Sequence, residues 1–385
     1  MQELSAEDRI DSPTEVSLPG GPGTSEGLRH LDPSHVALLR DAGAFRLWVP
    51  ERDGGTQASV QQGLDAIRAA AAEDGAAGWC VMIANTTALL AARLQPEHAD
   101  TIYGSRNAIT GGMAAPLGRA RLVDGGLEVT GHWAWGSGIH HCTHFGGGCL
   151  VVDEQGEPTA APDGARAPFV FFTMDQVEIH DTWRTSGLRG TGSADYSVER
   201  AFVPDGRWVD MQRNPLLVDD PLYRFSLFGA LALGVAAIGL GLADRAVREL
   251  IELGGKVPAG SRRSLAERPA IQADLARAEA EAAAADAYMR HTVAEAWNHA
   301  RDHGGHDAAT RRALRLAANH AITASTRAVD LCYTAGGGAA VYDTNALQVI
   351  FRDMHVATQH AMTAPRVYEP LGRMAFGLET DTRTL

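Results

Sequence analysis

Cysteine and basic side chains are both scarce in this chain of 385 residues. The four cysteines, Cys80, Cys142, Cys149 and Cys332, form neither a CxxC pair nor a secreted disulfide framework, so a reducing cytoplasm is the expected location. Lys and Arg number 34 against 47 Asp and Glu, which gives a net charge of −13. Such an acidic surface repels phosphate-rich polymers and anionic membranes, so we expect no nucleic-acid or membrane partner.

The start of the chain lacks the basic segment and the apolar run of a secretory signal, and residues 1–30 are predicted to be a disordered tail. Charge is also missing from Phe225 to Ala243, a stretch with nearly the length of a membrane span. This stretch is rich in Gly and Ala rather than in Leu and Ile. It therefore predicts a helix buried in a bundle rather than a membrane span.

Hydrophobic patterning divides the remaining chain into three regions. Residues 31–112 have helical composition, and Asp32 with Pro33 is a plausible helix start. Residues 113–215 contain short β-rich runs, including two strands joined by a Gly-Gly turn. Residues 216–385 return to long helical patterns. The sequence predicts an α+β protein with an N-terminal α-helical domain, a central β domain and a C-terminal four-helix bundle.

Several segments occur in an order that is known from one superfamily. They include "FRLWVPERDGG", "GHWAWGSGIHH", "TWRTSGLRGTGSADYSVERAFVP" and "FRDMHVATQH". Over about residues 35–375 the chain resembles the acyl-CoA dehydrogenase superfamily. This resemblance implies an acyl-CoA dehydrogenase-like fold, a flavin bound between the β domain and the bundle, and a homotetramer.

The position of one histidine separates the chemistries of that superfamily. Dehydrogenases commonly carry a carboxylate base about eight residues after an Arg-Asp pair, but Arg352-Asp353 is followed at that distance by His360 and Ala361. This pattern resembles the two-component flavin-dependent monooxygenases of group D, in which the histidine faces the flavin. The resemblance implies a hydroxylase that takes reduced flavin, FMN or FAD, from a separate NAD(P)H-flavin reductase. With O2 it would hydroxylate a small aromatic or polyketide-like substrate.

An imidazole suits that reaction because it can donate a hydrogen bond or take a proton from a phenolic substrate. His360 is therefore the predicted catalytic residue, although a histidine that only packs on the last helix is the alternative. Two other functions stay open. One is an acyl-CoA dehydrogenase whose base lies elsewhere, at Glu249 or Glu252, and the other is a flavin-binding scaffold without turnover.

The stretch "GHWAWGSGIHHCTHF", residues 131–145, is unusually rich in Trp and His. The resemblance implies that Trp135, Ser137 and Gly138 line the flavin, that Ser137 assists catalysis, and that His141 faces the substrate. Trp133 and Trp135 are otherwise ordinary sheet residues or mark a bulge. Metal binding by the histidines is disfavoured, because alternation along a strand sends neighbouring side chains to opposite faces. No metal is expected.

The resemblance implies further contacts outside this stretch. Those to the flavin ring and its phosphates are Thr182, Trp183, Thr191, Ser193, Arg262, Arg263 and, near the adenosine half, Gly337. On the substrate side, Asn85 stands where relatives that act on phenols have a histidine, and Trp79 lies nearby. For Trp79 a core position is the competing interpretation.

Overall fold

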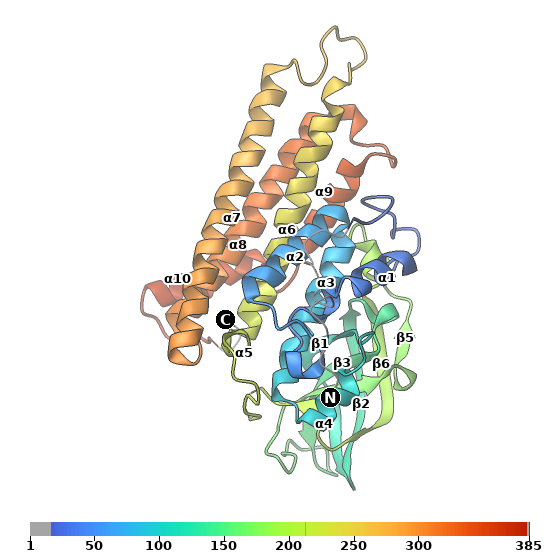
Figure 1. The fold of residues 1–385 in the computed structure, drawn as a ribbon, viewed down its shortest axis with the longest axis vertical. Coiled ribbons are helices and arrows are strands. Elements are labelled where there is room, and N and C mark those ends of the chain that lie inside the picture. Colours follow the sequence, from blue (N-terminus) through green and yellow to red (C-terminus); the bar gives the residue numbers. More distant parts are fainter. Residues whose placement is uncertain (1–16, 212, 383–384) are drawn as a thin grey trace, which may run out of the picture.

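The computed structural model describes residues 17–211, 213–382 and 385, and it arranges them as helices, then strands, then helices (Figure 1). This order confirms the predicted α+β class. The N-terminal helices are α1 (Pro33–Asp41), α2 (Val60–Glu73), α3 (Gly75–Ala88) and α4 (Pro96–Tyr103).

Helix α3 is central to the structure because nearly all its side chains are buried. Asp74 caps the helix, since its carboxylate accepts hydrogen bonds from the backbone N–H groups of Ala76 and Ala77. A helix that is apolar all round must be covered on every side. Helices α2 and α6 (Leu227–Glu252) and strand β1 (Thr110–Val123) supply that cover.

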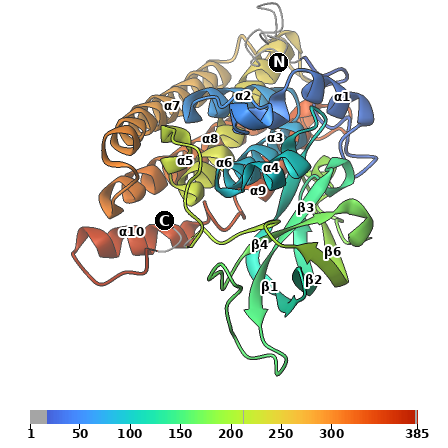
Figure 2. The same ribbon diagram turned by 60° about the horizontal axis from the view of Figure 1, so that its bottom comes forward.

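The β region is a single mixed sheet of seven strands in the order β5-β6-β2-β1-β3-β4-β7. Strands β1 and β2 form the predicted hairpin, with Gly125 at a φ of +74° in its turn, and β1 also pairs in parallel with β3. Figure 2 shows the sheet as a layer beside the helices. The remaining strands are β2 (Gly126–Gly136), β3 (His144–Val152), β4 (Phe169–Thr173), β5 (Glu178–His180), β6 (Ala194–Pro204) and β7 (Trp208–Val209).

The C-terminal region is built from four long helices that pack against one another. They are α6, α7 (Pro269–His303), α8 (Ala308–Gly336) and α9 (Ala346–Ala357), with the short helices α5 (Pro221–Arg224) and α10 (Tyr368–Ala375) at their ends. Two stretches, 75–93 and 227–255, are long and apolar enough to cross a membrane, but 94% and 78% of their apolar windows are buried inside the protein. Such burial is typical of core helices.

Glycines let α6 approach its neighbours, as its composition predicts. A Cβ at Gly234 would lie 2.5 Å from Met82 of α3, and one at Gly241 would lie 2.3 Å from the carbonyl oxygen of Arg68 on α2. Because real Cβ atoms do not approach that closely, larger residues would separate these helices.

Residues 17–30 differ from the prediction of a disordered tail. Leu18 and Ser25 are buried, Glu26 pairs with Arg352 of α9 at 2.7 Å, and Arg29 pairs with Asp181 at 2.5 Å. These ion pairs and the buried apolar contact hold the segment against the body of the protein. The rest of the predicted tail, residues 1–16, lies outside the described residues.

Candidate functional site

A line of buried hydroxyl groups runs between α3 and the two turns that flank the sheet. The indole Nε1 of Trp79 donates a hydrogen bond to Ser137 Oγ at 3.0 Å, and Ser137 Oγ lies 2.7 Å from Ser193 Oγ. Ser193 Oγ lies 2.6 Å from Thr191 Oγ1, which donates to the carbonyl oxygen of Leu188 at 2.8 Å. Four residues that the sequence analysis selected are thus joined in one network. We call Ser137, Ser193 and Thr191 the hydroxyl chain.

The backbone before this chain is bent in an unusual way. Trp135 has a φ of +62°, and the register of β2 against β6 shifts between Trp133 and Gly136. Trp133 is fully buried and stacks on Tyr196, whereas Trp135 is 64% exposed. The alternative of a sheet residue is therefore correct for Trp133. A non-glycine residue held in the left-handed region costs about 1–3 kcal/mol and is typical of functional sites.

His360 lies just beyond α9 and packs its ring on Trp79, the residue that donates to Ser137. Its ring meets the Trp79 indole edge-on, with centroids 5.5 Å apart. Its Nδ1 accepts from the backbone N–H of Met362 at 3.3 Å, an assignment that leaves the proton on Nε2. Burial, and then the charge of Arg315, lower the pKa of His360 to about 4. The imidazole is therefore neutral at pH 7 and can donate from Nε2.

His141 lies in the turn that follows β2. Its ring contacts Phe45 at a centroid distance of 5.6 Å, and it lies beside Gly138, whose φ is +76°. Burial, followed by His140 and His30, lowers the pKa of His141 to about 4. Among residues 17–211, 213–382 and 385, no three His, Cys, Asp or Glu side chains are grouped to hold a metal ion.

Comparison with known proteins agrees with this geometry. The family model described as "Acyl-CoA dehydrogenase, C-terminal domain" matches residues 233–365. Indole-3-acetate monooxygenase of Pseudomonas putida is 29% identical over 92% of this chain and 90% of its own. The oxygenase subunit HsaA of a flavin-dependent monooxygenase from Rhodococcus jostii is 29% identical, over 93% and 95%. A solved structure of 3-HSA hydroxylase from Rhodococcus sp. RHA1 superposes with a TM-score of 0.83 at 26% identity, over 94% of each chain.

The chain is thus similar to the acyl-CoA dehydrogenase superfamily in its C-terminal region and to monooxygenases over nearly its full length. Its relatives named above are monooxygenases or hydroxylases rather than dehydrogenases. This confirms the resemblance that the ordered segments and the histidine after Arg352-Asp353 indicate.

The site offers the groups that a flavin of this superfamily needs. An isoalloxazine ring has two apolar faces and a polar edge, so it requires a flat apolar surface beside hydrogen-bonding groups. The exposed indole of Trp135 can supply the surface, and the buried hydroxyl of Ser137 can supply a partner for the edge. Gly138, directly after Ser137, leaves the backbone there without a side chain. This set of groups fits the ring of FMN or FAD equally well.

The Asp of the Arg-Asp pair that is typical of the superfamily stabilises the turn around Leu188. Asp353 is buried, and its carboxylate accepts a hydrogen bond from the backbone N–H of Leu188 at 2.5 Å. Leu188 has a φ of +48°, and its carbonyl ends the hydroxyl chain. Burial raises the pKa of Asp353 to about 8. Sequence reasoning used the pair only as a landmark and did not predict this role, although its fixed spacing to His360 was a signal.

Thr182 and Trp183 support the turn around Leu188. The indole of Trp183 donates to the Leu188 carbonyl at 3.0 Å, and Thr182 Oγ1 accepts from the backbone N–H of Asp195 at 2.9 Å. Trp183 thus lies at the end of the hydroxyl chain, and Thr182 lies beside the start of β6. Their direct contact with a flavin stays a prediction.

Asn85 has a different place from the one predicted. Its side chain is fully buried, donates to the carbonyls of Ala44 and Val81, and accepts from the backbone N–H of Trp48. The bonds to Ala44 and Trp48 join α3 to the segment before α2, and the bond to Val81 lies within α3. A substrate role for Asn85 is therefore wrong, because the amide is occupied by backbone groups. Trp79 is both a core residue and a neighbour of His360.

Three predicted flavin contacts lie apart from the hydroxyl chain in this structure: Arg262, Arg263 and Gly337. The two arginines are exposed in the connection between α6 and α7, at the end of the bundle away from the sheet (Figure 1). Gly337 is exposed at the end of α8, with a φ of +56°. Their contacts with phosphate and adenosine stay a prediction.

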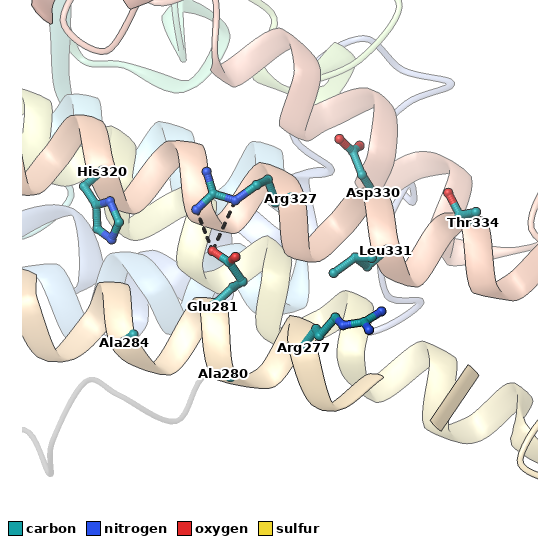
Figure 3. Close-up of a pocket in the computed structure, with 9 residues that line it drawn as sticks. All are labelled: Arg277, Ala280, Glu281, Ala284, His320, Arg327, Asp330, Leu331 and Thr334. Carbon is teal, nitrogen blue, oxygen red and sulfur yellow. Dashed lines mark hydrogen bonds and ion pairs between the residues drawn. The ribbon is translucent and has the colours of Figure 1, made fainter. Parts of the chain in front are cut away.

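A surface groove of about 690 Å³ runs between α7 and α8, apart from this site (Figure 3). Glu281 of α7 and Arg327 of α8 form an ion pair across it at 2.6 Å. The groove is open and its floor is largely apolar. Its lining residues are Arg277, Ala280, Glu281, Ala284, His320, Arg327, Asp330, Leu331 and Thr334.

The low pKa of His360 predicts how stability depends on pH. Its folded pKa of about 4 lies below the unfolded value of about 6.5, so stability is complete above pH 6.5 and falls as the pH drops toward 4. At pH 5.5 one such histidine removes about 1.3 kcal/mol relative to pH 7.5. We expect the melting temperature to fall less between these pH values in His360→Gln than in the wild type. Equal falls would contradict a neutral buried imidazole.

Proposed function

We propose that the protein is the oxygenase component of a two-component flavin-dependent monooxygenase. It would bind reduced FMN or FAD that a separate NAD(P)H-flavin reductase delivers, and use O2 to hydroxylate a small aromatic substrate. The relatives named as monooxygenases support this proposal over nearly their full lengths.

One observation carries the choice of chemistry. A neutral imidazole, His360, packs on Trp79, which donates to the hydroxyl chain, at the sequence position where a dehydrogenase of the superfamily would commonly carry a carboxylate. Removal of a proton from an acyl thioester requires a base that is positioned beside the substrate carbon. An imidazole that stays neutral at pH 7 with Nε2–H available is instead suited to donate a hydrogen bond to an oxygen atom.

The two carboxylates that would serve a dehydrogenase with its base elsewhere lie too far along α6. Contacts of Gly75 with Leu242 and of Gly234 with Met82 show that α3 and α6 run in opposite directions, so Trp79 lies near residue 238 of α6. Glu249 is eleven residues further, which is about 16 Å at 1.5 Å per residue. It also pairs with Arg245 at 2.6 Å, and Glu252 lies further still.

The residues at the site have separable tasks in this reaction. A bound reduced flavin would supply the two electrons for the reaction with O2. Trp135 would cover its ring, and Ser137 would hold its polar edge. His360 would donate from Nε2 to the oxygen that is to be transferred, and it could take the proton that a phenolic substrate releases. His141, whose ring packs on the buried Phe45 at a centroid distance of 5.6 Å, is the proposed contact for the substrate.

Removing the imidazole tests its assignment. His360→Ala is expected to keep the fold and flavin binding but to reduce coupled product formation by about 10²–10⁴-fold, with the electrons diverted to hydrogen peroxide. The ratio of peroxide to product, the flavin affinity and the melting temperature are measured on one preparation. His355→Ala is the matched control, because His355 pairs with Asp330 on α8 and should leave the ratio unchanged. A His360→Ala protein that is less stable but fully coupled would show that His360 only packs.

We further propose that the protein is a cytoplasmic homotetramer. The described cysteines are all unpaired, which agrees with a reducing compartment. The apolar surface of α6 is buried within one subunit and does not bear on assembly. Support for assembly comes from the groove between α7 and α8 and from exposed apolar side chains such as Tyr342 and Phe376.

Light scattering tests the assembly. A particle of four times the 40.9 kDa chain mass is expected at micromolar concentration, because the exposed apolar groups would be covered in the tetramer. Tyr342→Ser with Phe376→Ser should lower the mass. A monomeric mass for the wild type would defeat the proposal.

A further inference from the structure

The hydrogen bonds along the hydroxyl chain can be arranged in more than one way. At one end Ser137 Oγ accepts from Trp79 Nε1 at 3.0 Å, and at the other Thr191 Oγ1 lies 2.8 Å from the Leu188 carbonyl. Each of the two inner contacts, Ser137 with Ser193 and Ser193 with Thr191, joins two hydroxyls, so either oxygen can be the donor. The chain therefore has two possible directions.

In the first direction every hydroxyl hydrogen points toward Leu188. Ser137 donates to Ser193, Ser193 donates to Thr191, and Thr191 donates to the carbonyl. Ser137 then has its hydrogen in use and one lone pair left, since Trp79 occupies the other. In this direction Ser137 can only accept a hydrogen bond from a ligand.

In the second direction every hydrogen points toward Ser137. Thr191 donates to Ser193, and Ser193 donates to Ser137, whose two lone pairs are then filled by Ser193 and Trp79. The hydrogen of Ser137 is now available, so Ser137 can only donate to a ligand. The Leu188 carbonyl is not left unsatisfied by this change, because Trp183 Nε1 still donates to it at 3.0 Å.

The two directions match the two redox states of a flavin. The central-ring nitrogen at the polar edge carries a hydrogen in reduced flavin and a lone pair in oxidised flavin. We propose that Ser193 and Thr191 are positioning residues that reverse the hydrogen-bond direction of Ser137 when the bound flavin changes redox state. This rests on the proposed function, which places the flavin edge at Ser137. The hydroxyls only rotate about their C–O bonds, and no proton leaves its oxygen.

The hydroxyl chain also makes the site favour one redox state of the flavin over the other. The first direction uses every hydroxyl hydrogen within the protein, whereas the second gives up the bond from Thr191 to Leu188. The site therefore favours reduced flavin, the form that the proposed reductase delivers. One neutral hydrogen bond corresponds to about a threefold to tenfold preference, or about 0.7–1.4 kcal/mol at 1.4 kcal/mol per tenfold.

Removing the Thr191 hydroxyl should fix the chain in the second direction. In Thr191→Val the hydrogen of Ser193 has only Ser137 left to accept it, so Ser137 must donate. The ratio of the dissociation constants of reduced to oxidised flavin should then rise about threefold to tenfold. The potential of the bound flavin should fall by about 15–30 mV, at about 30 mV per tenfold for two electrons. Both are measured with FMN and FAD, by anaerobic titration and by equilibration with a redox dye.

Three further variants keep the test decisive. Thr191→Ser retains the hydroxyl and should keep the wild-type ratio. Ser193→Ala frees the Ser137 hydrogen and should shift the ratio as Thr191→Val does, which covers a Thr191→Val protein that does not fold. Thr292→Val removes a buried hydroxyl on α7 that donates to the Tyr288 carbonyl within the same helix, and it should leave the ratio unchanged.

The outcomes separate this inference from the proposed function. If the wild type couples flavin oxidation to product but Thr191→Val and Ser193→Ala weaken both redox forms equally, the reversible chain is wrong and the monooxygenase stands. If the wild type binds neither form of FMN or FAD, the proposed function fails and this inference fails with it.

Discussion

The bond from the buried Asp353 carboxylate to the backbone of Leu188 fixes the turn on which the site depends. This one contact joins α9 to the connection before β6, and it holds Leu188 in a left-handed conformation that a branched residue adopts at a cost. The Leu188 carbonyl then ends the hydroxyl chain, whose other end reaches Trp79 on α3. Helices and sheet are thus tied together through the residues that would hold the flavin.

The same arrangement explains why a large apolar core and a polar site can share one helix. Helix α3 is buried nearly all round, yet Trp79 directs its only polar atom at Ser137. A buried indole N–H needs an acceptor, so the site satisfies a requirement of the core while remaining able to bind a ligand. The ring of His360 packs on the same indole, which links its position to the packing of α3 against α9.

Several features of the fold and the site could be predicted from the sequence. The hairpin turn at Gly125, the glycine-rich core helix α6 and the His360 spacing each follow from local patterns that tertiary contacts reinforce. The role of Asn85 could not be predicted, because its partners are backbone groups about forty residues away in the sequence. The packing of residues 17–30 was missed for a similar reason: polar segments carry no periodicity, and the ion pairs of Glu26 and Arg29 are long-range.

The central claim is that the site at Trp135, Ser137 and His360 holds a reduced flavin and directs its reaction with oxygen. Its most direct test mixes the anaerobic complex of protein and reduced flavin with O2 and an aromatic substrate, and follows flavin absorbance and product together. We predict that the flavin reoxidises with a time course distinct from that of free flavin and that hydroxylated product accumulates with it. Reoxidation at the rate of free flavin, with hydrogen peroxide as the sole product for every aromatic compound tried, would contradict the account.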